Sequence, residues 1–377
     1  MGGGLMQLVA YGAQDIYLTG NPQITFFKVV YRRHTNFSME AIEQTWNGTL
    51  GSASRQTCTV SRNGDLVHRM YLEVTTPSLQ TDGTDDNYGH GIIDNVELEI
   101  GGQKIDKHTG AWMETWSELT EPNPTGAKTV SGATDGTRFQ RMALGGGADI
   151  GGGGGQLIWV PLQFWFCRNP GLALPLIALQ YHEVKVILTY NTFSASTHTA
   201  PTKVDLFCDY IYLDTDERRR FAQVSHEYLI EQVQEESKAS GGNMDINFNH
   251  PVKELIWTGT PVVATGASTP VAIGTNDFYL KLNGHDRFAK RDYRYFTRTQ
   301  IWQHHTGYGG TTVSDSIGVY SFALKPEEHQ PSGTCNFSRI DNAQLIEDGG
   351  STSLVVYAVN YNVLRIMSGM GGLAYSN

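Results

Sequence analysis

Three short segments in the first half of the chain recur, in the same order, in the second half. The distance between the members of a pair falls slowly, from 188 to 186 to 182 residues. The pairs are Ala41–Thr45 with Leu229–Val233, Asn63–Tyr71 with Asn249–Trp257, and Leu98–Gln103 with Leu280–His285. A single match could be chance, but three matches in one order indicate two copies of one fold, with shorter loops in the second copy.

Both copies contain stretches in which apolar and polar residues alternate with a period of two. In one of them Val96, Leu98 and Ile100 alternate with Glu97 and Glu99. This pattern, enriched in β-branched and aromatic residues, is typical of half-buried strands. With 42 glycines and 13 prolines in loops of unequal length, it favours Greek-key sandwiches over helix bundles or a repeat solenoid. The other stretches are Phe37–Ala41, Leu66–Val74, Val184–Leu188, Val204–Leu213, Phe278–Leu282, Val319–Leu324 and Leu354–Leu364.

A helical signal lies between the two copies. Asp214 has the character of an N-cap, Glu217 stands at the third helical position, and the bases Arg218–Arg220 follow the acids, as the helix dipole favours. We therefore expect the domain joint at this short helix. The 377 residues are also too many for one ordinary core. The expected division is an N-terminal arm over 1–24, a first sandwich over 25–213, a linker over 214–224 and a second sandwich over 225–377.

The charge of the chain argues against nucleic acid as a direct partner. Its formal net charge is −10, from 28 Lys and Arg against 38 Asp and Glu, whereas phosphate contacts need positive patches. No apolar run reaches the length of a membrane span. The first residues lack the charged-then-apolar order of a signal peptide, so we expect no secretory route.

Motifs for catalysis or metal binding are incomplete. His182–Glu183 and His226–Glu227 begin like the zinc-protease motif, but the second histidine is replaced by Val186 and by Ile230. The neighbours His304–His305 would point to opposite faces of a strand, and we expect both on the surface. The expectation is therefore no catalytic residue, no cofactor and no metal site.

The connection from about Glu121 to Gln156 is loop-like, and its stretch Gly145–Gly155 is mostly glycine. Glycine at this density disfavours helix and strand. The Gly-Lys-Ser/Thr of a phosphate-binding loop does not follow, so we expect a surface loop that binds no ligand.

Two further residue sets receive a plain interpretation. Four cysteines show neither a C-x-x-C pair nor a zinc spacing, so we expect buried free thiols: Cys58, Cys167, Cys208 and Cys335. Three asparagines stand in N-glycosylation sequons, which we expect to be chance matches because no secretory route is expected and Asn36 lies on an apparent core strand. They are Asn36, Asn47 and Asn336.

Several segments, spread over both ends and both copies, carry a specific resemblance. Leu8–Asp15 reads LVAYGAQD, Leu18–Lys28 reads LTGNPQITFFK, Pro175–Glu183 reads PLIALQYHE and Asn362–Tyr375 reads NVLRIMSGMGGLAY. The chain resembles the major capsid proteins of large icosahedral nucleocytoplasmic DNA viruses, of the chlorella-virus or phycodnavirus type. Further matching stretches are Val96–Lys107, Tyr210–Gln232 and Gln330–Asn342.

The resemblance implies an all-β fold of two tandem eight-stranded antiparallel jelly-roll sandwiches. It also implies a structural role without enzyme activity. Three chains would form a homotrimer of pseudo-hexagonal outline, and such trimers would tile the virion shell in the infected cell. Implied partners are neighbouring capsomers, minor capsid proteins and an internal viral membrane beneath the shell.

Two other functions stay open at this point. A sugar-binding jelly roll would need exposed aromatic residues, which Tyr308, Trp302 and Trp257 could supply. A cupin-like enzyme would need a clustered metal site, but the chain has no H-x-H spacing.

Overall fold

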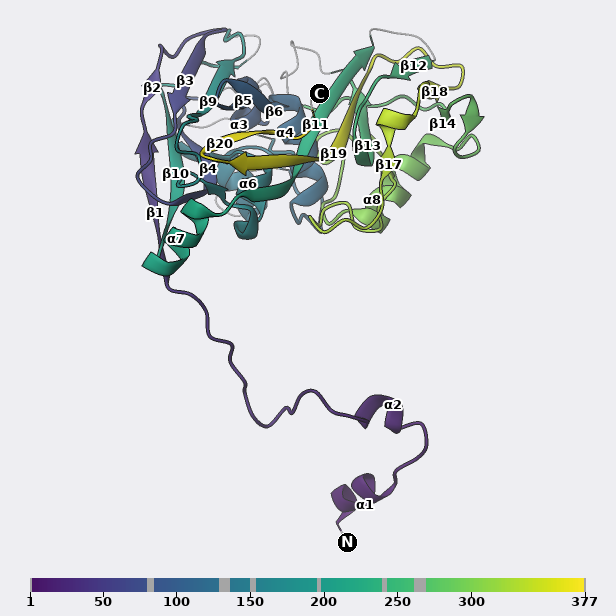
Figure 1. The fold of residues 1–377 in the computed structure, drawn as a ribbon. Coiled ribbons are helices and arrows are strands. Elements are labelled where there is room, and N and C mark those ends of the chain that lie inside the picture. The colour runs from purple at the N-terminus through teal and green to yellow at the C-terminus, as the bar shows by residue number, and fades with distance from the viewer. Residues whose placement is uncertain are drawn as a thin grey trace. The chain divides into compact units, whose positions relative to one another are not determined.

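In the computed structural model the described residues form four antiparallel sheets, two from strands that precede helix α7 (Thr215–Gln223) in the chain and two from strands that follow it. Figure 1 shows α7 at the end of β10. Contacts divide the chain into a segment Met1–Asn36 and a body Phe37–Asn377. The structure describes residues 2–79, 85–128, 136–149, 154–194, 198–238, 243–260 and 269–375.

The segment before the body has little regular structure. It contains two short helices, α1 (Gly3–Val9) and α2 (Ile16–Thr19), and neither has a buried residue. Many of its apolar side chains are exposed, Phe27 almost completely. The first strand begins only at Phe37, so residues 25–36 carry no strand.

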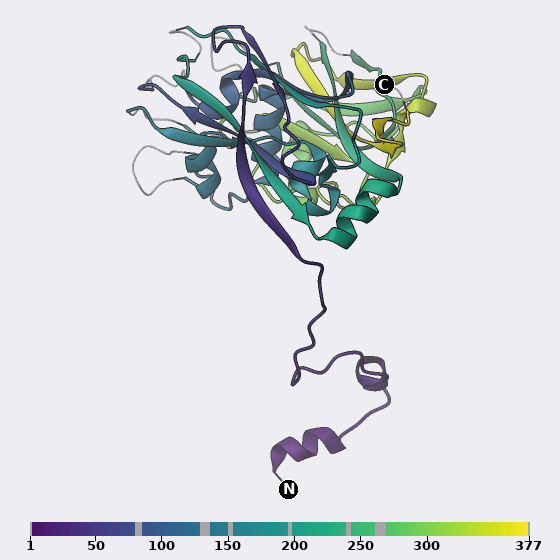
Figure 2. The same cartoon turned by 60° about the vertical axis from the view of Figure 1, so that its left-hand side comes forward.

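The first sandwich pairs a sheet in the order β1-β10-β4-β7 with a sheet in the order β2-β3-β9-β5-β6. Strands β1 and β10 lie side by side and antiparallel, and β10 ends next to α7 (Figure 2). The first sheet comprises β1 (Phe37–Gln44), β10 (Lys203–Leu213), β4 (Leu66–Thr75), β7 (Leu157–Pro161) and β8 (Leu174–Pro175), which pairs with β4. The second comprises β2 (Trp46–Asn47), β3 (Arg55–Thr59), β9 (Val184–Tyr190), β5 (Ile93–Ile100) and β6 (Gln103–Thr109).

The second sandwich repeats this order in β11-β19-β13-β16 and β12-β18-β14-β15. Its first sheet comprises β11 (His226–Lys238), β19 (Leu354–Met367), β13 (Pro251–Gly259) and β16 (Ile317–Ser321), with β17 (Cys335–Asn336) on β13 and β20 (Met370–Leu373) on β19. Its second sheet comprises β12 (Asn243–Ile246), β18 (Ala343–Glu347), β14 (Phe278–Leu282) and β15 (His285–Asp286).

The two halves therefore share one topology. In the first sheet of each half, the places taken by β1, β4, β7 and β10 are taken in the second half by β11, β13, β16 and β19, in that order. In the second sheet of each half, the equivalents of β3, β5, β6 and β9 are β12, β14, β15 and β18. These are the eight-stranded jelly rolls that the resemblance implied. The three repeated sequence segments fall on corresponding strands, so the predicted duplication is confirmed. The strands predicted from alternation are confirmed as well, except that the strand predicted over Val319–Leu324 ends at Ser321.

Helix α7 confirms the helical signal at the joint. The Asp214 carboxylate accepts a hydrogen bond from the Glu217 amide at 3.0 Å, as an N-cap does. Arg218 pairs with Asp65 of the first half. None of the described sheets combines strands from both sides of α7.

None of the helices in the connections other than α7 was predicted. Helix α4 (Gly110–Thr120) follows β6, and α5 (Arg138–Ala143) lies within the connection that was expected to be loop throughout. Among the described residues no helix is long and apolar enough to cross a membrane. The remaining short helices are α3 (Tyr88–Gly91), α6 (Trp165–Arg168), η1 (Pro170–Leu172), η3 (Tyr295–Thr299), α8 (Gln300–His304) and η4 (Phe337–Arg339).

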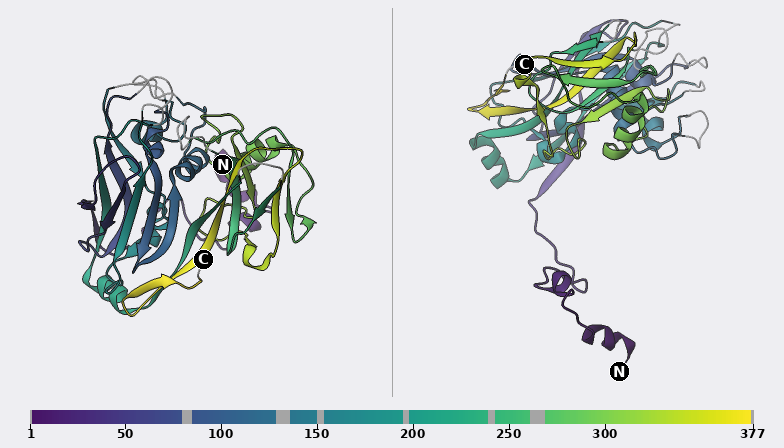
Figure 3. Two further views of the ribbon diagram at one scale, coloured as in Figure 1. Left: turned by 90° about the horizontal axis from the view of Figure 1, so that it is seen from above. Right: turned by 90° about the vertical axis from the view of Figure 1, so that its right-hand side faces the viewer.

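The first sheet of the second sandwich is buried on both faces. Val356 and Ala358 of β19 pack inside their own sandwich, whereas the alternate residues Tyr357 and Val359 belong to a core shared with the first half. Seen from above, this sheet lies between helices of the first half and the other strands of the second half (Figure 3, left). The two sandwiches therefore meet in an apolar core.

Candidate assembly surface

Helix α4 covers the outer face of the second half's sheet. Its first turn is capped by Thr109, whose hydroxyl accepts from the Trp112 amide at 3.2 Å. Trp112 stacks on Trp116 one turn later, with 5.4 Å between ring centroids, and packs on Tyr357 of β19 at 5.1 Å. The aromatic face of α4 thus holds the two sandwiches together.

A buried ionic cluster flanks this aromatic contact. Glu231 of β11 pairs with Arg168 of α6 at 3.2 Å and with Lys253 of β13 at 2.9 Å. Burial alone would raise the pKa of Glu231, but Arg168, His329 and Lys253 outweigh it and lower the pKa to about 2. Arg168 also lies over the Trp116 ring, 5.0 Å from its centroid. The cluster therefore joins the two halves through a charged pair that is largely removed from water.

The expectation that His304 and His305 both lie on the surface is wrong for His305. The residue follows helix α8 and is buried between two carboxylates, Glu254 at 3.0 Å and Glu327 at 3.1 Å. Burial lowers the pKa of His305, but the two acids outweigh this effect and raise the pKa to about 9. This is a structural ion triad, and its formation depends on residues distant in sequence.

The expectation of a surface loop at Gly145–Gly155 is also wrong for its first part. Gly145–Gly147 is buried, because the Glu114 carboxylate of α4 accepts from the Gly146 amide at 3.0 Å and from the Gly147 amide at 2.6 Å. A Cβ on Gly147 would lie 2.5 Å from Thr311. Gly154 and Gly155 are exposed as expected, and residues 150–153 lie outside the described residues.

Glu118, one turn after Glu114 on α4, binds the second half through its side-chain carboxylate. Its carboxylate accepts from the Thr311 amide at 2.6 Å and from the Thr312 hydroxyl at 3.1 Å. Burial and the neighbouring Glu114 raise the pKa of Glu118 to about 8. The functional residues that the sequence analysis did not predict are thus mainly those of α4. The N-cap at Thr109 and the spacing of Trp112 and Trp116 are the sequence features that would have indicated this helix.

The corresponding outer face in the first half is covered by the body only at one end, where Phe221 of α7 packs on Leu66 and Ile211. On the sheet β1-β10-β4-β7 the rings of Tyr71 and Phe207 stack 5.6 Å apart and remain partly exposed. On the same sheet Phe37 is 54% exposed, Met39 49% and Trp159 38%. Apolar residues on an uncovered sheet face mark a contact surface.

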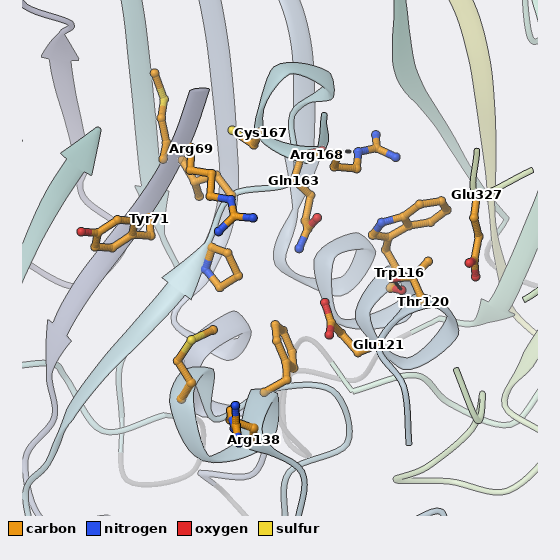
Figure 4. Close-up of a pocket in the computed structure, with 15 residues that line it drawn as sticks. Arg69, Tyr71, Trp116, Thr120, Glu121, Arg138, Gln163, Cys167, Arg168 and Glu327 are labelled. Carbon is orange, nitrogen blue, oxygen red and sulfur yellow. Dashed lines mark hydrogen bonds between the residues drawn. The ribbon is translucent and has the colours of Figure 1, made fainter. Parts of the chain in front are cut away.

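A groove borders this face (Figure 4). It has a volume of about 610 Å³ and is lined by Arg69 and Tyr71 of β4, Trp116 of α4 and Arg138 of α5, among others. In Figure 4 Arg69 and Tyr71 lie on one side and Trp116 on the other. The groove therefore extends the uncovered sheet face toward the boundary between the halves.

A second exposed patch lies on the second half. Trp302 of α8 is 82% exposed and lines a hollow of about 530 Å³ together with Tyr308. Leu324 is 77% exposed, and its carbonyl lies within hydrogen-bond distance of the His304 ring. Trp257, the third aromatic residue considered for sugar binding, is fully buried in β13, so that expectation is wrong.

The other predicted sites have these positions. His182 bonds to backbone atoms of Gly371, and His226 lies near the Phe221 carbonyl. No group of three or more potential ligands for a metal occurs among the described residues. All four cysteines are free, and Cys335 is only partly buried. Asn36, Asn47 and Asn336 are exposed. Asn36 precedes β1, which is mostly exposed, so its expected place on a core strand is wrong.

Family models match both halves of the chain. Residues 25–214 match the model described as major capsid protein N-terminus, and residues 217–372 match the model described as large eukaryotic DNA virus major capsid protein. Over the whole of both chains, the sequence is 54% identical to the major capsid protein of Pyramimonas orientalis virus and 42% identical to that of Paramecium bursaria Chlorella virus 1.

Solved structures show the same fold. A chain of the PBCV-1 virus capsid aligns with a TM-score of 0.78 and 37% identity, over 94% of this chain and all of that chain. The Faustovirus major capsid protein aligns with a TM-score of 0.63 at 14% identity, over 95% of this chain and 94% of that chain, which is a likeness of fold.

Proposed function

The chain belongs to the major capsid protein family of large eukaryotic DNA viruses, and from this membership we propose that it builds the virion shell as a homotrimer of pseudo-hexagonal outline. It is a structural protein of the virus capsid with a double jelly-roll fold. The observation that carries the proposal is the match along the full length to capsid proteins, because it includes both jelly rolls and both ends of the chain.

The presence of two similar blocks in one chain supports the proposed trimer. Three such chains present six jelly rolls around an axis, and cyclic closure needs one heterologous interface used three times. The uncovered sheet face of the first half and the exposed Trp302 patch supply two different apolar surfaces for such an interface. Permanent interfaces of this kind bury on the order of 2,000 Å² or more.

We further propose that each jelly roll is a domain. The first would span residues 25–213 and the second 225–377, joined by the linker 214–224. The separate sheets and the capped helix α7 support this division. The apolar core between the halves predicts that they unfold together.

The proposal includes no catalytic activity and no direct contact with nucleic acid. The formal charge of −10 supports the second point. Neighbouring capsomers, minor capsid proteins and the internal membrane are the proposed surroundings, and the exposed apolar residues of Met1–Asn36 would suit contact with one of them. Asn36, Asn47 and Asn336 are proposed to carry no glycan, because a three-residue sequon is short enough to occur by chance.

Two measurements test the proposal. Light scattering of the purified protein across a dilution series should give the mass of a trimer at micromolar concentration and physiological salt. Quantitative mass spectrometry of purified virions should find this chain as the most abundant shell protein. A folded monomer in the first experiment would refute the trimer, and a trace amount in the second would assign the chain to a minor shell component.

A further inference from the structure

Helix α4 carries two buried carboxylic acids on one face, Glu114 and Glu118. Glu114 is fully buried and Glu118 is 2% exposed. Residues four apart on a helix lie next to each other on its surface, so the two carboxyl groups are neighbours inside the protein. Two negative charges this close in a site without water repel each other strongly, unless each is balanced by a positive charge or by a proton.

Of the two acids, Glu114 has a positive partner. The His90 imidazole of α3 lies 2.5 Å from the Glu114 carboxylate, and the two can form a buried ion pair. Within the part of the chain that the structure describes, no base forms an ion pair with Glu118, whose carboxylate meets the uncharged Thr311 amide and Thr312 hydroxyl. One positive charge therefore serves two carboxyl groups, and a proton on Glu118 balances the second.

The surroundings of α4 supply no further positive charge for this pair. Among the described residues, the buried histidines on the elements that pack against α4 are already paired with acids. They are His90 of α3 with Glu114, His108 of β6 with Asp106, and His305 after α8 with Glu254 and Glu327. Glu121, at the end of α4, is a further acid, and burial raises its pKa.

Glu118 holds a loop of the second half, residues 307–312, against α4. Its carboxylate accepts a hydrogen bond from the Thr311 amide at 2.6 Å, and its backbone carbonyl accepts one from the Gly309 amide at 2.9 Å. The same loop carries Tyr308, which is 54% exposed and lines the hollow on the second half. The charge on Glu118 therefore acts directly on a contact between the two halves.

We propose that Glu118 is a proton-operated latch between the two halves: with its proton it holds the loop 307–312 on α4, and loss of the proton places a second negative charge beside Glu114 and releases the loop. The latch lies within one chain and does not depend on the proposed trimer. Its closed form raises the pKa of Glu118 to about 8, through burial and Glu114, whereas a Glu118 exposed to water in the open form has the ordinary value of 4.5. Opening therefore releases a proton between these two pH values. The closed form is most stable below pH 4.5, weakens as the pH rises, and has lost this contribution above pH 8.

Hydrogen exchange followed by mass spectrometry tests the latch in the full-length protein. The exchange rate of a peptide that contains residues 307–312, divided by the intrinsic rate at each pH, gives the opening constant of the loop. Release of one proton predicts that this constant rises about tenfold per pH unit from pH 6 to pH 8 and is level above pH 8. A peptide that contains Gly146 and Gly147, whose partner Glu114 is balanced by His90, should show no such rise. A constant that does not change with pH, or exchange of the loop only together with strand β19, would overturn the inference.

Glu118→Gln is the matched variant, because its amide keeps the shape and the hydrogen bonds of the acid but has no proton to lose. The rise with pH should be absent in this variant and unchanged in Glu183→Gln, which replaces an exposed acid. A rise that persists in Glu118→Gln would contradict the latch.

The wild-type protein provides a readout that does not require the variant to fold. Its infrared spectrum should contain the band of a protonated carboxyl group at pH 7, and this band should decrease as the pH passes 8. A spectrum without a protonated carboxyl group at pH 7 would show that Glu118 is already ionised, and the inference would then be wrong.

Discussion

Trp112 of helix α4 packs against Tyr357 of strand β19 with 5.1 Å between the ring centroids, and through this contact each half completes the core of the other. Both side chains are almost fully buried, although they lie in different sandwiches. Stability of the two halves is therefore coupled at a small number of aromatic residues.

Replacement of Trp112 by alanine tests this coupling. The loss of a buried indole leaves a cavity between the sandwiches, and we expect the free energy of unfolding to fall by about 3–5 kcal/mol. Denaturant unfolding followed by fluorescence and by circular dichroism measures the change. Tyr181→Ala, which removes a side chain that is 75% exposed, is the control and should change stability by less than about 0.5 kcal/mol. Equal effects of the two substitutions would contradict the role of Trp112.

The lowered pKa of Glu231 predicts that the folded protein loses stability in acid. Its pKa is lowered to about 2 in the folded protein, below its ordinary value of 4.5, so its ion pairs stabilise the fold above pH 4.5 and this contribution is lost as the pH falls toward 2. The contribution is on the order of 3 kcal/mol by the pKa difference. Urea unfolding between pH 2 and 5 should show a flatter pH dependence for Glu231→Gln than for the wild type. Glu183→Gln, at an exposed position, should reproduce the wild-type slope.

The raised pKa of His305 predicts that the folded protein loses stability as the pH rises. Its pKa is raised to about 9 from the ordinary 6.5, so the charged imidazole stabilises the fold fully below pH 6.5, and this contribution disappears as the pH rises through 9. The difference in unfolding free energy between wild type and His305→Gln should therefore shrink from pH 6.5 to 9.5. A difference that is constant over this range would show that the imidazole is neutral between Glu254 and Glu327.

Two glycines of one loop should respond differently to alanine. Gly147 has a φ of +83°, and a Cβ there would lie 2.5 Å from Thr311, so Gly147→Ala should destabilise the protein by more than about 1 kcal/mol. Gly154 has nothing within 4 Å of its Cβ position, and Gly154→Ala should be nearly neutral. Thermal unfolding of both variants decides the matter, and equal melting temperatures would contradict the packing of Gly147.

Treatment with a chelator should leave the melting temperature unchanged. The expectation follows from the incomplete motifs at His182 and His226, whose nearest partners are backbone groups. A stabilising metal would be lost to the chelator and the protein would then melt earlier. Calorimetry before and after dialysis against the chelator measures this, with metal analysis of the dialysed protein as the control.

The sequence predicted what depends on local pattern. Strand alternation located strands such as β5 and β10, and the acid-to-base order at Asp214 located α7. The duplicated segments predicted the repeated topology, because similar sequences in the same order adopt similar strands.

Features that depend on partners distant in sequence could not be predicted. His305 is buried where it forms ion pairs with Glu254 and Glu327, which are distant in the sequence. Gly146 is buried where its amide donates a hydrogen bond to the Glu114 carboxylate. Trp257 and Trp302 are both tryptophans in the second half, yet one is fully buried and the other 82% exposed. The residue type does not distinguish the buried tryptophan from the exposed one. The strand of Trp257 belongs to a sheet that is buried on both faces, so it shows no alternation of apolar and polar residues that would predict burial.

The sheet with two buried faces also has a consequence for synthesis on the ribosome. Its strands β13 and β19 carry Ile256, Tyr357 and Val359 toward the first half, and without that half they would present an apolar sheet surface to water. Such surfaces aggregate when they appear before their cover. The order of the halves along the chain avoids this, because α4 leaves the ribosome long before β19 is translated. A chain with its halves exchanged could have the same final contacts, but it would expose the sheet while its cover was still being made.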